Sequence, residues 1–169
     1  MRYSSVAAAA ALTLLAISTS LHGQRPDDQI DPRSMALLAK GRAAQAAGNL
    51  DAATDTLETA VAVDPRNRAA FVALGQVADA RGLPGKAIRL YREALLLEPN
   101  DVAALKGQGE ALVAKGAVQR AKDNLAKIRA ICAKTGCTDA TSLAAVIAKG
   151  PPIATASVEP PAAKPTAKE

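Results

Sequence analysis

The sequence predicts an all-α fold built from repeated antiparallel helix pairs. Hydrophobic residues make up 49% of the chain but aromatic residues only 2%, and alanine supplies much of the apolar share. Alanine favours helices, whereas strands favour β-branched and aromatic side chains. Two similar segments, 61–67 and 95–101, place Pro65 and Pro99 34 positions apart, which indicates an internal repeat.

The N-terminal segment has the features of an export signal. Arg2 precedes an apolar run from Val6 to Ile17, and small residues follow up to Gly23. This run has twelve residues, whereas a membrane span needs about 20. We expect a signal peptide over 1–23, a polar lead-in over 24–33, and a periplasmic or secreted protein with no stable membrane span once the signal is cleaved. An uncleaved signal anchor is the alternative.

Three copies of the repeat follow, at 34–67, 68–101 and 102–135. Glycine recurs at the eighth position (Gly41, Gly75, Gly109) and the fifteenth (Gly48, Gly82, Gly116), and alanine at the twentieth (Ala53, Ala87, Ala121). Small residues at the eighth and twentieth positions allow two helices to pack closely. A glycine at the fifteenth position ends the first helix in a left-handed cap. This pattern resembles the tetratricopeptide-repeat family.

The resemblance implies an α-solenoid of about seven helices, a right-handed superhelix whose first helices line a concave groove. The groove would bind an extended peptide or a helix of a partner protein. Positions of the family that point into it are occupied by Leu38, Arg42, Gln45, Val72, Gln76, Asp79, Lys106, Glu110 and Val113. Some members grip a C-terminal carboxylate with a Lys/Asn clamp, but Leu38 and Val72 stand where such polar residues would help, so this mode is not expected.

The region after the third repeat predicts a capping helix over 138–149, with Leu143, Val146 and Ile147 on one face. Cys132 and Cys137 flank the turn before it. In an oxidising compartment such a pair first indicates a disulfide bond. A thiol–disulfide redox pair is the alternative, and two thiols fall short of the four ligands of a zinc site, so no metal is expected. The proline-rich tail, 150–169, is expected to be disordered.

Charge and motifs favour a binding protein over an enzyme. The net charge of +5 comes from scattered residues, and we expect no nucleic-acid partner, although a basic tail that binds an anionic polymer is an alternative function. No phosphate-binding loop or nucleophile motif is present, so neither a cofactor nor catalysis is expected. The sequence thus predicts a scaffold or adaptor of the bacterial cell envelope. Self-association is a further expectation, because a short solenoid leaves apolar edges.

Overall fold

The computed structural model describes residues 29–133 and 137–151, and within these ranges it contains seven helices and no strand. The helices are α2 (Pro32–Ala46), α3 (Leu50–Val63), α4 (Arg68–Ala80), α5 (Pro84–Leu97), α6 (Val102–Ala114), α7 (Val118–Ile131) and α8 (Thr138–Lys149). The expected signal peptide and nearly all of the expected tail lie outside the described residues. No helix in the described part of the chain is long and apolar enough to cross a membrane.

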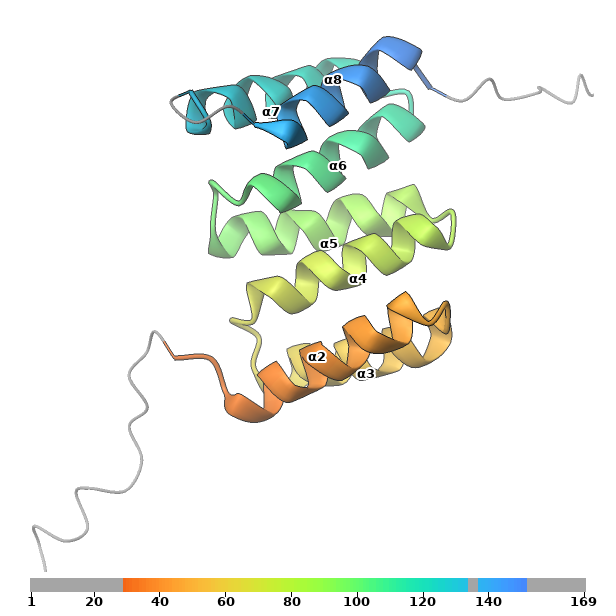
Figure 1. The fold of residues 1–169 in the computed structure, drawn as a ribbon, viewed down its shortest axis with the longest axis vertical. Helices are drawn as coiled ribbons and strands as arrows, with labels where there is room; N and C mark the ends of the chain where they lie inside the picture. The colour runs from red at the N-terminus through yellow and green to blue at the C-terminus, as the bar shows by residue number, and fades with distance from the viewer. Residues whose placement is uncertain (1–28, 134–136, 152–169) are drawn as a thin grey trace, which may run out of the picture.

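The helices form three antiparallel pairs that stack one on another. α2 packs on α3, α4 on α5 and α6 on α7, and the first helices α4 and α6 also contact the pair that precedes them (Figure 1). The single helix α8 lies against both α6 and α7 and closes the stack. This arrangement is the all-α solenoid that the sequence predicted.

The turn inside each pair depends on a glycine. Gly48, Gly82 and Gly116 have φ angles of 77°, 69° and 76°, a left-handed conformation that other residues adopt at a cost. Each ends the first helix of its repeat, and the three turns follow one another along one edge of the solenoid (Figure 1).

The first helix of each repeat starts at a capping side chain. Asn67 and Asp101 accept a hydrogen bond from the third backbone N–H beyond them and begin α4 and α6 at the expected repeat starts. The equivalent residue of the first repeat is Arg33, which has no oxygen to accept such a bond. Asp31 caps α2 instead, so the helix begins at Pro32, two residues before the expected start at Ser34 and inside the expected lead-in.

Tyr91 is the largest fully buried side chain, and glycines make room for it. A Cβ on Gly75 of α4 would lie 2.6 Å from Cε1 of the ring, and one on Gly107 of α6 would also overlap it. In the first pair, Gly41 accommodates Leu57 in the same way, whereas Gly109 accommodates Leu143 of α8. The repeated glycines therefore set the distance between neighbouring helices.

Buried hydrogen bonds join α2 to α3 and to the residue that caps α4, and join α6 to α7. The Asn67 side chain donates to Ser34 Oγ over 2.7 Å, and that hydroxyl donates to the backbone carbonyl of Ala60, also over 2.7 Å. Asn124 donates to the side chain of Gln108 and to the backbone carbonyl of Leu105. Because a buried polar group is costly without its partner, these bonds favour one register of the stacked helices.

Candidate functional site

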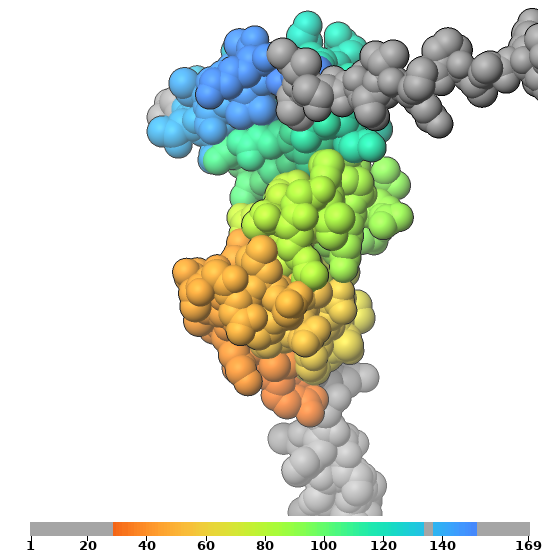
Figure 2. Space-filling view, turned by 90° about the vertical axis from the view of Figure 1, so that its right-hand side faces the viewer, coloured from red at the N-terminus to blue at the C-terminus, as the bar shows by residue number. Residues whose placement is uncertain are grey.

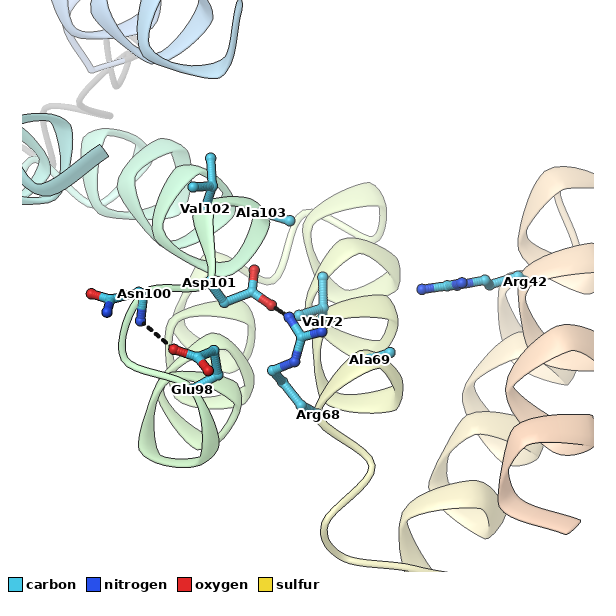
Figure 3. A pocket seen from close by; sticks show the side chains of 9 residues that line it. All are labelled: Arg42, Arg68, Ala69, Val72, Glu98, Asn100, Asp101, Val102 and Ala103. Carbon is cyan, nitrogen blue, oxygen red and sulfur yellow. Dashed lines mark hydrogen bonds and ion pairs between the residues drawn. The ribbon is translucent and has the colours of Figure 1, made fainter. Parts of the chain in front are cut away.

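The solenoid is hollowed on the side that carries the first helices. The space-filling view shows an indented outline between the α2–α3 pair and α8 (Figure 2). One hollow of about 500 Å³ lies there, where α2, α4 and the start of α6 meet (Figure 3). It is lined by Arg42, Arg68, Ala69, Val72, Glu98, Asn100, Asp101, Val102 and Ala103.

The polar groups of this hollow are mostly engaged with one another. The guanidinium of Arg68 forms an ion pair with Asp101, whose other oxygen caps α6 by accepting from the N–H of Ala104. Glu98 accepts from the backbone N–H of Asn100 over 3.0 Å. Arg42 extends from α2 toward the hollow and has no hydrogen-bond or ion-pair partner in the part of the chain that the structure describes. It is therefore a cation available to a ligand, beside apolar surface from Ala69 and Val72.

Carboxylates lie further along the same face. Asp79 of α4 and Glu110 of α6 line a second hollow of about 260 Å³ with Gly82, Pro84, Ala111 and Ala114. Burial raises the pKa of Asp79 to about 6, although its hydrogen bond from the Tyr91 hydroxyl, 2.9 Å long, opposes the shift. Burial also raises the pKa of Glu110; Lys106 opposes this shift and Asp139 adds to it. The concave face thus presents a cation at α2 and half-buried carboxylates between α4 and α6.

The structure separates the nine expected groove residues into two groups. Leu38, Val72 and Val113 are buried, so as a group they are core residues and not exposed groove side chains, although Val72 also lines the hollow beside Arg42. Leu38 packs in the cluster formed by α2, α3 and α4, and Val113 packs beside Val146 and Ile147 of α8. The more accessible group contains Arg42, Gln45, Gln76, Asp79, Lys106 and Glu110.

Other residues of the face were missed or have additional partners. Lys106 Nζ lies 3.4 Å from Asp139 Oδ1, so this groove residue also ties α6 to the capping helix. Arg68, Glu98 and Asn100 line the first hollow but were not expected there, since they occupy the helix start and the connecting loop. The Pro99-Asn100-Asp101 turn was the signal that could have located this loop beside the groove.

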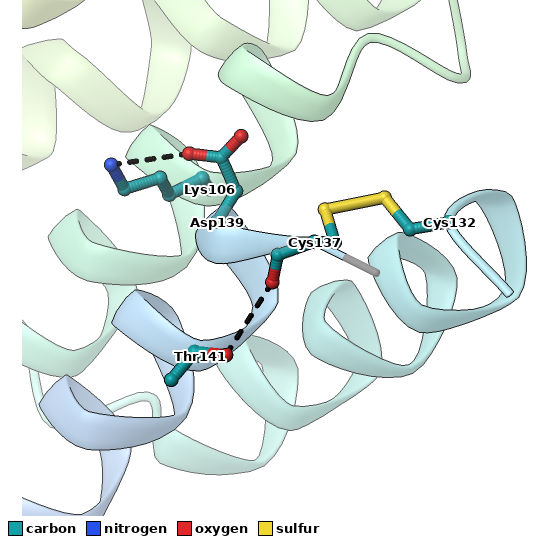
Figure 4. Close-up of a disulfide and its surroundings, with 5 residues drawn as sticks. All are labelled: Lys106, Cys132, Cys137, Asp139 and Thr141. Carbon is teal, nitrogen blue, oxygen red and sulfur yellow. Dashed lines mark hydrogen bonds and ion pairs between the residues drawn. A yellow bond between two sulfur atoms is a disulfide. The ribbon is translucent and has the colours of Figure 1, made fainter. Parts of the chain in front are cut away.

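The two cysteines form a disulfide bond. Cys132 ends α7, Cys137 precedes α8, and their Cα atoms are 5.6 Å apart (Figure 4). Both side chains are half-buried against the cluster of Leu105, Leu125 and Leu143. Among the described residues, no group of three or more His, Cys, Asp or Glu side chains is arranged to hold a metal ion.

Comparison with known proteins identifies the family. A family model described as "Tetratricopeptide repeat" matches residues 38–95 and 72–129, which together span more than half of the chain. The chain therefore belongs to the tetratricopeptide-repeat family. No curated protein sequence matches it.

Solved structures share the fold. The TPR domain of Sgt2 from Aspergillus fumigatus is 21% identical, with a TM-score of 0.67 over 75% of this chain and 83% of that one. The first TPR of Spaghetti (RPAP3), bound to the HSP90 peptide SRMEEVD, is 19% identical, with a TM-score of 0.64 over 69% of this chain and 91% of that one. The MamA protein is 28% identical, with a TM-score of 0.56 over 60% of this chain and 55% of that one.

Proposed function

We propose that this protein is a non-enzymatic adaptor that holds a peptide or helical segment of a partner protein on the concave face of α2, α4 and α6. The observation that carries the proposal is the hollow of about 500 Å³, which has apolar surface and is lined by Arg42, a cation with no partner among the described residues. Ligand sites typically combine apolar walls with a few polar groups that fix orientation. A TPR domain of the same fold is bound to a peptide in the Spaghetti structure, which supports this use of the face.

The charges of the face suggest the chemistry of the bound segment. Arg42 would pair with an acidic group, and Ala69 and Val72 would contact an apolar side chain. Asp79 and Glu110 would accept from a cationic or neutral donor further along the segment. Leu38 and Val72 do not provide the polar groups of a Lys/Asn clamp, so the proposed ligand is an internal segment and not a C-terminal carboxylate.

The proposed setting is the bacterial cell envelope. It rests on the signal-like residues 1–23 and on the cysteine pair, which suits an oxidising compartment. Cell fractionation with N-terminal sequencing tests this part: a periplasmic or secreted chain that begins near residue 21 or 24 supports export and cleavage. A full-length chain found only in the cytoplasm contradicts it.

Affinity capture from a native extract, followed by mass spectrometry, tests the groove. The altered bait carries Arg42→Glu with Gln76→Ala, and the matched bait carries Lys40→Glu with Thr59→Ala. Lys40 and Arg42 are both exposed on α2, but two helical positions apart they point in nearly opposite directions. A partner held in the groove is retained by the native and matched baits and lost from the altered bait. Proteins that bind all three baits equally contradict the proposal.

A further inference from the structure

The junction between the first and second repeats contains two exposed ion pairs. Arg81 Nη1 lies 2.8 Å from Asp51 Oδ1, and Lys86 Nζ lies 3.2 Å from Glu58 Oε1. Both carboxylates belong to α3, and both cations belong to the following repeat. The second helix of the first repeat thus neutralises two cations of its neighbour.

The next junction keeps the cations and lacks the carboxylates. One repeat later, Arg81 and Lys86 correspond to Lys115 and Arg120, while Asp51 and Glu58 correspond to Gly85 and Arg92. Lys115, Arg120, Arg92 and the neighbouring Arg89 are exposed. Within the described ranges none of these four side chains has an ion-pair or hydrogen-bond partner. We refer to Arg89, Arg92, Lys115 and Arg120 as the junction patch.

A hollow with both charged and apolar walls lies at this patch. It has a volume of about 530 Å³ and is lined by Gly82, Leu83, Pro84, Gly85, Lys86, Arg89 and Lys115. Leu83 is 46% exposed, although it is a large apolar residue. Most of its lining residues belong to the turn between α4 and α5 and to the start of α5. Figure 1 shows this turn on the edge of the solenoid where the three glycine turns follow one another. It is separate from the hollow beside Arg42, with which it shares no lining residue.

We propose that the junction patch is a second docking site, which binds an acidic segment of a partner protein. The partner's carboxylates would form ion pairs with Lys115 and Arg120. These pairs would be equivalent to those that α3 forms with Arg81 and Lys86 at the first junction. Asp51 and Glu58 are seven residues apart on a helix, which corresponds to about 10 Å. The segment therefore carries two carboxylates at about that spacing, with an apolar side chain to cover Leu83.

The same features argue against other occupants. A second copy of this chain is disfavoured, because the carboxylates of its α3 that have the required spacing already pair with Arg81 and Lys86. Single-stranded nucleic acid is bound with the help of exposed aromatic rings. Among the described residues, the aromatic side chains are those of Tyr91, which is buried, and Phe71, which is partly buried against the same cluster.

A variant that fills the patch from within the chain gives a direct test. Gly85→Asp with Arg92→Glu places carboxylates at the positions that Asp51 and Glu58 occupy in the first repeat. A Cβ at Gly85 meets no atom within 4 Å, so the substitution fits the fold. We expect a melting temperature higher than that of Gly85→Ala, which gains from helix propensity alone, because Lys115 and Arg120 also gain partners. The control, Lys40→Glu with Lys149→Gln, alters the net charge by the same three units at distant exposed positions.

The probe is a 15-residue synthetic peptide with glutamate at every third or fourth position among alanine and leucine, and its control has glutamine in place of glutamate. The native and control proteins are expected to bind the glutamate peptide, and the filled variant to bind it at least about tenfold more weakly, since several surface ion pairs are lost together. The glutamine peptide should bind neither the native protein, nor the control protein, nor the filled variant. Each protein is also tested with Arg42→Glu added, so that an acidic peptide held by Arg42 at the proposed concave site does not contribute to the comparison.

Other results overturn the proposal. Equal binding of the glutamate peptide by the filled variant would show that the junction patch is not its site. Patch-dependent binding of polyuridine RNA or of phosphatidylglycerol vesicles, without binding of the peptide, would assign a different polyanion. Self-association that disappears in the filled variant, measured by sedimentation, would assign a second copy. Absence of binding by every probe would leave the patch as an ordinary solvated surface.

Discussion

At the scale of single residues, the buried Tyr91 connects the core to the concave face. Its ring occupies the space that Gly75 and Gly107 leave between α4 and α6, and its hydroxyl donates to Asp79. The packed core thereby fixes the position of a carboxylate that lines the second hollow. Burial of both groups also raises the pKa of the tyrosine and of the carboxyl.

The raised pKa of Asp79 makes stability depend on pH. The folded state retains the proton up to about pH 6, whereas the unfolded chain releases it near 3.8. The unfolded state is therefore increasingly favoured as pH rises from about 4 to about 6. Asp79→Asn keeps an oxygen for the Tyr91 hydroxyl and removes this titration. It should stabilise the fold at pH 7.5 by roughly 1 kcal/mol, a value reduced for the half-exposed position, and leave stability nearly unchanged at pH 4.

Urea unfolding at pH 4, 5, 6 and 7.5 measures this difference between the variant and the native protein. Comparing the two chains cancels the titration of other groups, including Asp64, whose pKa is lowered to about 2 mainly by its hydrogen bond from Arg66. If the difference in unfolding free energy between the two proteins stays constant across this pH range, Asp79 is not the group whose titration changes stability.

At the scale of helices, the contact between α4 and α5 depends on the absence of a side chain at Gly75. A Cβ there would lie 2.6 Å from Cε1 and 2.7 Å from Cζ of Tyr91, so the buried ring would have to move. Overpacking of this kind costs about 1–3 kcal/mol, partly offset by the higher helix propensity of alanine. Gly75→Ala should therefore lower the free energy of unfolding by about 1 kcal/mol or more.

Gly85→Ala is the matched substitution in α5. Its Cβ would meet open space, so only the gain in helix propensity acts, and we expect an increase of up to about 1 kcal/mol. Denaturant unfolding of both variants measures whether the free energy of unfolding falls for Gly75→Ala and rises for Gly85→Ala. If both substitutions stabilise the protein, close packing at Gly75 is not what requires glycine there.

The capping helix α8 is held by apolar contacts, by the Lys106–Asp139 ion pair and by the disulfide bond (Figure 4). Replacing Cys132 and Cys137 by serine removes a constraint on a short loop. The expected loss of stability is on the order of 2 kcal/mol. Thermal unfolding should show this loss. Relative to the native protein, amide hydrogen exchange of the variant should accelerate more in α8 than in α4.

Partner capture should be unaffected by the double serine variant, since neither cysteine lines the concave hollows. The alternative function, a thiol–disulfide redox protein, predicts instead that the variant loses turnover of a disulfide substrate while its stability changes little. The two readouts together decide between a structural bridge and a redox pair.

At the scale of the whole molecule, the repeat pattern was sufficient to predict the architecture. Proline, glycine and alanine at fixed positions set where helices end and how closely they pack, and these are local properties of the chain. α8 also has the bounds that its apolar face indicated, Thr138–Lys149. The start of α2 was missed because capping depends on which nearby side chain offers an oxygen, Asp31 or Arg33.

The candidate site was less predictable than the fold. Leu38 and Val113 occupy repeat positions that face the groove in the family, but their side chains pack against neighbouring helices. Burial at such positions depends on the adjacent repeat and on α8, not on the position within one repeat. The junction patch likewise became visible only when the ion pairs of one junction were compared with the equivalent positions of the next.

The central claim, that the concave face holds a partner segment, is tested most directly by site-specific photo-cross-linking in the native host. A photoreactive amino acid replaces Gln76, which is exposed on α4 at the repeat position equivalent to Arg42, or Thr59, which is exposed on α3. The account predicts a discrete protein adduct from position 76, absent from position 59 and suppressed by Arg42→Glu. No adduct from position 76, or the same adducts from both positions, would contradict it.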